Sequence, residues 1–141
     1  MEISQKALKQ QMLDFGVKPS AQRLAILSYL QTHFTHPTVD DIFAELSPEM
    51  PTLSKTTVYN TLKLLADSGM VSSLNLDEKN QHFDGDTRPH AHLKCTNCGR
   101  IEDVFLNNMA LFELPETNCR INKVEISYSG LCSKCNSENI N

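Results

Sequence analysis

Long hydrophobic runs are missing from this sequence, and no uncharged segment approaches the roughly 20 residues that a membrane-spanning helix requires. The N-terminal segment, residues 1–6, is polar and lacks the apolar core of a secretory signal. These absences argue against an integral membrane protein. They predict a soluble cytoplasmic protein that has no membrane partner.

An excess of positive charge is also missing. Residues 1–84 contain seven Lys or Arg against ten Asp or Glu, and the whole chain has a formal net charge of −4. Proteins that bind nucleic acids are usually basic, so bulk electrostatics gives no support to a DNA-binding role. Any contact with DNA must therefore come from the local placement of particular side chains.

Cysteine is absent from residues 1–94, and all five cysteines follow that segment. Four of them form two Cys-x-x-Cys pairs, Cys95 with Cys98 and Cys132 with Cys135. In a reducing compartment such pairs favour metal binding over disulfides, and four thiolates complete the tetrahedral shell that zinc prefers. We expect one closed, structural Zn2+ per subunit. Cys119 is left over and is expected to be a small, partly buried apolar residue.

Helical spacing of apolar residues predicts a run of helices in the first half of the chain. They cover residues 4–14, residues 20–32, a segment capped by Thr38, and a segment from the cap Ser54 to the stop Gly69. Short strands near 70–76 and 80–84, joined by a polar turn, should follow as a wing. The side chains expected to face the core are Ala7, Leu8, Met12, Leu13, Leu24, Ile26, Leu27, Leu30, Val39, Ile42, Phe43, Leu46, Val58, Leu62, Leu65 and Ala66.

Helices followed by a small hairpin indicate a winged helix-turn-helix. The fourth helix presents polar, aromatic and cationic side chains opposite its apolar face, and such a mixture can contact phosphates and base edges in a major groove. A solvated surface face is the alternative interpretation. The candidate DNA-binding residues are Lys55, Thr56, Tyr59, Asn60 and Lys63.

The second half begins after a linker. We predict an α+β chain with a winged-helix DNA-binding domain at 1–84, a hinge at 85–90 and a small α/β zinc-containing dimerisation domain at 91–141. His90 and His92 should lie on one face of a strand, with Asp103 on the next strand beside Glu102. A strand over Ile121 to Leu131 could close a dimer or lie inside a sheet.

The order of the motifs resembles the ferric uptake regulator family over nearly the whole chain. The matching segments are Gly16-Val17-Lys18-Pro19-Ser20-Ala21-Gln22-Arg23, His36-Pro37-Thr38, Thr57-Val58-Tyr59, Phe83-Asp84, His90-Ala91-His92 and both Cys-x-x-Cys pairs. Within that family the chain is most similar to the peroxide-sensing repressors. The resemblance assigns the cysteine pairs to structural zinc and a regulatory Fe2+ or Mn2+ site to His36, Asp84, His90, His92 and Asp103.

What the resemblance implies is a metal-dependent repressor that binds a palindromic double-stranded DNA operator as a homodimer. A metal ion would join the two domains, and peroxide would act by oxidising a ligand histidine, His36 or His90. The regulatory set contains no thiolate, which suits Fe2+ and Mn2+.

Other interpretations remain open. Iron-responsive members of the family usually have glutamate at the position of Asp103 and more histidines in the dimerisation domain, whereas no histidine follows His92 here. His90, His92 and Asp103 could also form the two-histidine, one-carboxylate centre of a small non-haem iron enzyme, although a chain of this size has little material for a substrate pocket. A protein-interaction module is a third possibility. We expect a regulator and no enzyme.

Overall fold

The computed structural model describes residues 4–74, 80–121 and 124–138. The chain divides into two compact units, Met1–Thr87 and Arg88–Asn141, which are described separately. None of the helices in the described part of the chain combines the length and hydrophobicity that crossing a membrane requires.

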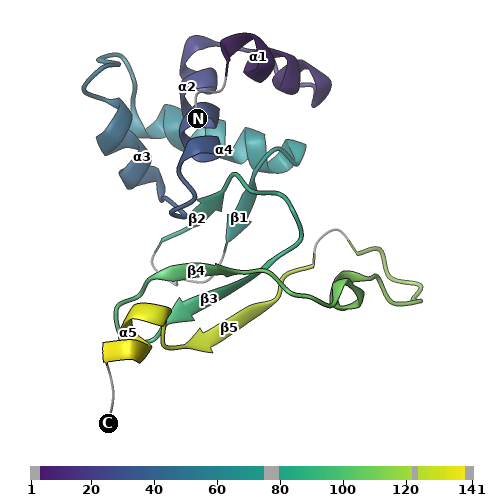
Figure 1. Cartoon of the computed structure of the whole chain (residues 1–141). Helices are drawn as coiled ribbons and strands as arrows, with labels where there is room; N and C mark the ends of the chain where they lie inside the picture. The colour runs from purple at the N-terminus through teal and green to yellow at the C-terminus, as the bar shows by residue number, and fades with distance from the viewer. Residues whose placement is uncertain (1–3, 75–79, 122–123, 139–141) are drawn as a thin grey trace. The chain divides into compact units, whose positions relative to one another are not determined.

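The first unit is mainly helical (Figure 1). Side-chain caps fix where three of its helices begin: Ser20 Oγ accepts the N–H of Arg23, Ser54 Oγ accepts that of Thr57, and Thr38 forms a capping box with Asp41. Gly69, at φ 87°, ends the last helix in a left-handed conformation that costs glycine little. The predicted helices and caps are confirmed. Their bounds are α1 (Gln5–Asp14), α2 (Ala21–Thr32), α3 (Val39–Leu46) and α4 (Lys55–Ser68).

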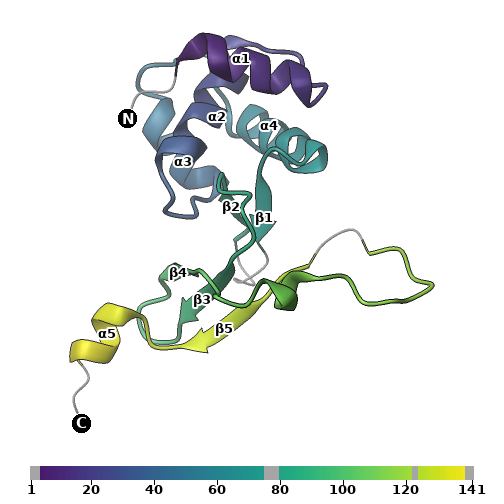
Figure 2. The ribbon, with the colours of Figure 1, turned by 45° about the vertical axis from the view of Figure 1, so that its right-hand side comes forward.

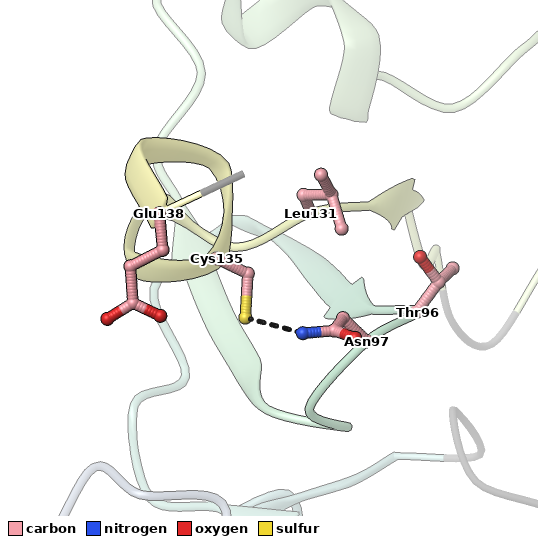
Figure 3. Close-up of a pocket in the computed structure, with 5 residues that line it drawn as sticks. All are labelled: Thr96, Asn97, Leu131, Cys135 and Glu138. Atoms are coloured by element: carbon pink, nitrogen blue, oxygen red, sulfur yellow. Dashed lines mark hydrogen bonds between the residues drawn. The ribbon is translucent and has the colours of Figure 1, made fainter. Parts of the chain in front are cut away.

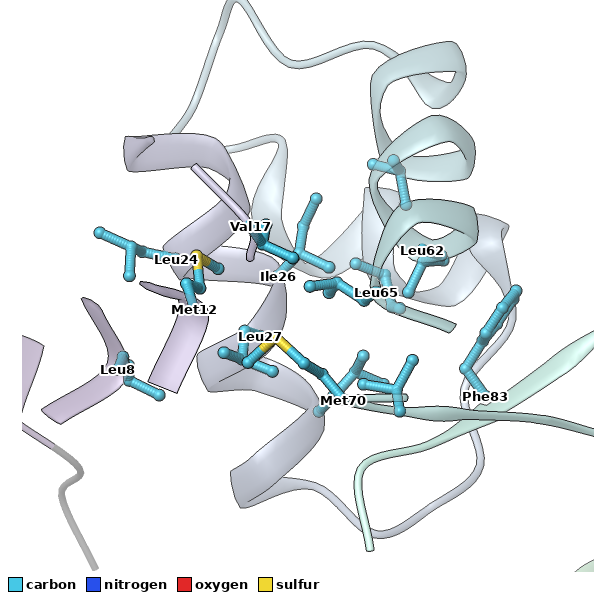
Figure 4. Packing of buried hydrophobic residues seen from close by; sticks show 14 of the residues in the cluster. Leu8, Met12, Val17, Leu24, Ile26, Leu27, Leu62, Leu65, Met70 and Phe83 are labelled. Carbon is cyan, nitrogen blue, oxygen red and sulfur yellow. The ribbon is translucent and has the colours of Figure 1, made fainter. Parts of the chain in front are cut away.

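The apolar faces of these helices form one core (Figure 4). Ile26, Leu27 and Leu62 are fully buried, as the periodicity predicts. The prediction is wrong for the outer edge of α1, because Leu13 is 59% exposed and Ala7 is also exposed. This helix needs only the narrow stripe of Leu8 and Met12 to pack against the rest, so the neighbouring apolar positions stay outside the core.

The wing consists of β1 (Ser72–Leu74) and β2 (His82–Asp84), which pair antiparallel. Both strands are shorter than predicted, and residues 75–79, most of the expected turn, lie outside the described residues. Phe83, 2% exposed, joins the helical core. Because side chains alternate along a strand, burial of Phe83 sets the direction in which His82 and Asp84 point.

The second unit is built on a sheet in which β3 (Ala91–Cys95) lies between β4 (Ile101–Val104) and β5 (Ser127–Gly130) (Figure 2). The central strand pairs antiparallel with β4 and parallel with β5. The predicted strand over Ile121 to Leu131 was too long, because β5 covers only four of those residues and 122–123 lie outside the described ones. Cys119 is exposed, so its expected role as a partly buried apolar residue is wrong. The other described elements of this unit are a 3-10 turn, η1 (Met109–Phe112), and a short helix, α5 (Ser133–Glu138).

A close backbone approach at Gly85 yields a test of the first unit. A Cβ at this position would lie 2.5 Å from the Leu30 carbonyl oxygen, which is rigid backbone in α2. We expect Gly85→Ala to lower the free energy of unfolding by about 1–3 kcal/mol, as overpacking does. Urea denaturation followed by circular dichroism measures this. Gly130→Ala is the control, since a Cβ added at this position would meet nothing within 4 Å. Equal effects of the two substitutions would contradict the steric argument.

Candidate metal centres and nucleic-acid face

The first cysteine pair lies where β3 ends. Cys95 is its last residue, and a tight turn follows in which the N–H of Gly99 donates to the Cys95 carbonyl at 3.1 Å. Gly99 adopts φ 78°, which lets the turn close directly after Cys98. The N–H of Cys98 points back to the Cys95 sulfur at 3.5 Å. The turn therefore directs a backbone dipole, as well as two sulfurs, toward one point.

The second pair lies at the start of α5, where the N–H of Cys135 approaches the Cys132 sulfur at 3.5 Å. One potential ligand atom from each of the four cysteines lies within 4.8 Å of every other, and Cys98 Sγ is 3.7 Å from Cys132 Sγ. A tetrahedral zinc with bonds of about 2.3 Å requires neighbouring sulfurs roughly 3.8 Å apart. The four sulfurs therefore fit a zinc ion with little rearrangement.

Electrostatics within the cluster also favour a cation. The hydrogen bond from the Cys98 N–H, helped by others from backbone, lowers the pKa of Cys95 to about 6. At Cys135 the hydrogen bond from the Asn97 side chain lowers the pKa, but the sulfur of Cys132 and burial raise it to about 12 overall. Four thiols this close cannot all ionise without a positive charge among them, which a metal ion supplies.

A pocket beside Cys135 is lined by Thr96, Asn97, Leu131, Cys135 and Glu138 (Figure 3). Within it, the Asn97 amide donates to Cys135 Sγ at 3.4 Å. Hydrogen bonds of this kind orient a metal-ligating group and stabilise its charge. The pocket therefore belongs to the outer shell of the thiolate cluster.

His36 and Asp84 come together in the first unit. His36 is 3% exposed and Asp84 is 1% exposed, and His36 Nε2 lies 3.6 Å from Asp84 Oδ2. The other carboxylate oxygen, Oδ1, accepts the N–H of Asp86 at 2.9 Å, which fixes the orientation of the carboxylate. Buried polar side chains with preset orientations are characteristic of ligands.

A second histidine and carboxylate group lies in the second unit. Asp103 Oδ1 is 3.2 Å from His90 Nε2 and 3.4 Å from His92 Nε2, and the two Nε2 atoms are 3.0 Å apart. His92 lies in β3 directly opposite Asp103, whereas His90 precedes the strand. His90 also packs against the ring of Phe105 at a centroid distance of 5.2 Å. Three potential ligand atoms therefore converge on one small volume.

The register of β4 distinguishes Asp103 from its neighbour Glu102. Glu102 is paired with Leu93, so its side chain leaves the sheet on the opposite face from Asp103. There Glu102 Oε1 accepts the hydroxyl of Ser133 at 2.8 Å and its N–H at 3.3 Å. The aspartate therefore faces the histidines, while the glutamate anchors the start of α5.

The five predicted regulatory ligands thus fall into two groups, one in each unit. The structure brings His36 to Asp84 in the first unit, and His90 and His92 to Asp103 in the second; the joining of the two groups stays a prediction. Sequence reasoning missed His82, whose Nδ1 donates to the His36 carbonyl at 2.6 Å. No motif or spacing marks His82, because its role comes from pairing across 46 residues of sequence.

The candidate DNA-binding side chains share the exposed face of α4, and Tyr59 is 49% exposed. Lys55 already has local partners, since its Nζ lies 3.2 Å from Asp40 Oδ1 and 5.7 Å from the centre of the Phe43 ring. Beside the helix, a pocket of about 450 Å³ carries polar and cationic side chains. Its lining residues are Lys18, Pro19, Ser20, Gln22, Arg23, Thr57, Asn60 and Thr61.

A winged helix-turn-helix followed by a small sheet with a tetrathiolate cluster defines a class of metal-responsive transcription regulators. Consistent with this, the sequence model of the ferric uptake regulator family matches residues 14–129. The chain belongs to the ferric uptake regulator family. The predicted family and fold class are confirmed.

Individual relatives point within the family to the peroxide-responsive branch. The chain is 36% identical over 123 residues to the peroxide-responsive repressor PerR of Staphylococcus aureus, an alignment that covers 85% of this chain and 83% of that protein. It is 30% identical to the Campylobacter jejuni peroxide stress regulator, with a TM-score of 0.67 and coverage of 96% and 100%. PerR from Streptococcus pyogenes is 26% identical, with a TM-score of 0.54 and coverage of 95% and 94%. All three are regulators rather than enzymes.

The thiolate cluster can be tested by separate replacement of its members. We expect Cys95→Ser and Cys132→Ser to abolish zinc retention and to unfold the second unit, because a serine hydroxyl does not ionise to become a ligand and metal binding supplies folding energy. Zinc content by mass spectrometry and near-ultraviolet circular dichroism measure the two effects.

Cys119→Ser provides the matched control, since this cysteine is exposed and lies outside the cluster. It should keep one zinc per chain. Full zinc content in Cys95→Ser would show that the thiolate cluster does not hold the metal.

Proposed function

We propose that this protein is a metal-dependent, peroxide-responsive repressor that binds a palindromic DNA operator as a homodimer. The observation that carries the proposal is the pair of histidine and carboxylate groups, one in each unit. Asp84 ends β2 and His90 stands just before β3, so the chain between the two groups is short. One Fe2+ or Mn2+ ion held by both groups would restrict how the units move relative to one another.

The ligand types of the two proposed sites favour different metal ions. Imidazole and carboxylate without thiolate suit Fe2+ and Mn2+, whereas the soft thiolates of the cysteine cluster favour Zn2+. The proposed regulatory ligands are His36, Asp84, His90, His92 and Asp103. The aspartate that faces the histidines favours the peroxide-responsive branch over the iron-responsive repressor, which usually has glutamate at this place.

DNA recognition is proposed for the exposed face of α4. Asn60 can pair with adenine, the methyl group of Thr56 can contact thymine, and Lys63 can neutralise a phosphate. Tyr59 and Lys55 complete the proposed surface. In a two-fold dimer the separation of the two α4 helices must match the spacing of the operator half-sites. A metal ion that limits the relative motion of the two units would therefore favour the separation that fits the operator.

Metal and DNA are then linked. If Mn2+ raises operator affinity, the operator raises Mn2+ affinity by the same factor, and typical couplings amount to about 1–3 kcal/mol. Mn2+ should therefore raise affinity for a palindromic duplex, selected from random DNA by the Mn2+-loaded protein, by roughly 5- to 150-fold. Fluorescence anisotropy at fixed salt concentration measures this.

His90→Ala should remove the gain, because it takes one of the converging nitrogens away from Asp103. His33→Ala is the matched control, since His33 lies in the same chain but stacks on Tyr29 at the end of α2 and belongs to neither ligand group. Equal affinity of the metal-free and Mn2+-loaded proteins would refute the proposed switch.

Peroxide responsiveness is proposed from the similarity to PerR of Staphylococcus aureus and to the Campylobacter jejuni regulator. Fe2+ held by these ligands would supply the redox chemistry: overall, one hydrogen peroxide would insert one oxygen atom into a C–H bond of a nearby imidazole, and its second oxygen would leave as water. His36 and His90 are the proposed acceptors. An oxidised imidazole is a poor ligand, so its group would lose hold of the ion and the repressor would leave its operator.

Tandem mass spectrometry tests this step directly. After treatment of the Fe2+-loaded protein with hydrogen peroxide, we expect one added oxygen on His36 or His90. The Mn2+-loaded protein should gain none, because Mn2+ does not readily undertake this reaction. His33, close to His36 in sequence, serves as an internal control, and oxidation of His33 as fast as His36 would mean that the damage is not directed by the site.

A further inference from the structure

The backbone at His36 adopts a conformation that needs external support. Its φ is 57°, and no other non-glycine residue in the described part of the chain has a positive φ. A left-handed conformation at such a residue costs on the order of 1–2 kcal/mol and persists only when neighbouring groups hold it. The side chain of His36 is nevertheless buried and lies 3.6 Å from Asp84.

Strand β2 supplies that support through two hydrogen bonds. The ring Nδ1 of His82 donates to the His36 carbonyl at 2.6 Å, and the N–H of Phe83 donates to the Pro37 carbonyl at 3.0 Å. The next residue of the strand is Asp84 itself. Consecutive residues of β2 thus hold the His36 loop and provide its carboxylate neighbour.

We propose that His82 is a positioning residue of the regulatory site: by donating to the His36 carbonyl, it fixes the backbone conformation that directs the His36 imidazole toward Asp84. The inference rests on the proposed role of His36 as a metal ligand. His82 Nδ1 contacts the backbone of His36, so the proposed effect of His82 acts through His36. Its ring must carry the proton on Nδ1, since a carbonyl oxygen can only accept.

The two hydrogen bonds differ in their donors, and only one donor is a side chain that a substitution can remove. The Phe83 N–H belongs to the backbone and survives any side-chain change except proline, so it keeps the loop near β2. The His82 bond is made by a side chain, so a substitution at His82 removes it while the Phe83 N–H keeps its bond to Pro37. Without it, the peptide that follows His36 can rotate, which would move the imidazole away from the carboxylate and leave the ligand group less preorganised.

The test compares Mn2+ affinity of the full-length, zinc-loaded protein among variants, using the electron paramagnetic resonance signal of free Mn2+. Groups that orient metal ligands typically contribute 10- to 100-fold to metal affinity. We expect His82→Ala to weaken Mn2+ binding by roughly that factor. His82→Asn should restore most of the affinity, because the asparagine amide nitrogen stands where the ring Nδ1 stood.

Gln81→Ala is the matched control. Gln81 donates to Ser73 across the same hairpin, so its substitution leaves the hydrogen bond from His82 to His36 in place and should leave Mn2+ affinity unchanged. Zinc content and the thermal unfolding midpoint check that His82→Ala remains folded. In the metal-free protein, the His36 ring Cε1–H resonance should shift in His82→Ala and return toward its original position in His82→Asn.

His36→Ala separates failure of this inference from failure of the proposed function. If His36→Ala binds Mn2+ like the unmodified protein, His36 is not a ligand, and both the proposed site and the role of His82 are wrong. If His36→Ala loses binding while His82→Ala keeps it, the site stands and the positioning role is overturned. Equal weakening in His82→Ala and His82→Asn would also overturn it, since the hydrogen bond would then not be the cause.

Discussion

Burial of Phe83 in the helical core is the constraint on which the first ligand group depends. Insertion of this ring against the helices fixes β2, and the alternation of the strand then directs His82 and Asp84. The Phe83 N–H meanwhile holds the His36 loop through the Pro37 carbonyl. One apolar contact therefore positions a carboxylate, a loop and a hydrogen-bond donor. The hydrophobic core thereby orders the residues of the proposed first ligand group.

The second unit reaches a similar result by different means. Its described apolar core is small, consisting of three buried cysteines with Leu93 and Leu131 packed against them. A sheet with so little apolar burial needs another source of stability, and metal bonds in the thiolate cluster supply it. The same strand that ends at Cys95 carries His92, so the zinc cluster also fixes the register that brings Asp103 to the histidines. The zinc cluster would thus help to order the proposed regulatory ligands of this unit.

Whether the sequence alone predicted a feature depends on how far apart in sequence the interacting residues lie. Caps such as Ser54 and the stop at Gly69 act within one helical turn, so local pattern found the helices and their ends. The paired cysteines were equally visible, because their spacing is part of the chemistry. The exposure of Leu13 was not predictable from periodicity, since the width of a buried stripe is set by neighbouring helices. The role of His82 was also hidden, because it depends on contact with a loop far away in sequence.

The charge of the first unit bears on the energy that the proposed metal switch would need to control DNA binding. Residues 1–84 are net acidic, which disfavours general attraction to DNA, and Asp40 would compete with a DNA phosphate for Lys55 in the proposed interface. An exposed ion pair of this kind contributes about 0–1 kcal/mol, which is enough to weaken a contact but not to prevent it. Phosphate contacts supply most non-specific affinity for DNA. A DNA-binding domain with few available cationic side chains would therefore depend more on the correct placement of both α4 helices. The proposed metal coupling of about 1–3 kcal/mol would change operator affinity by roughly 5- to 150-fold.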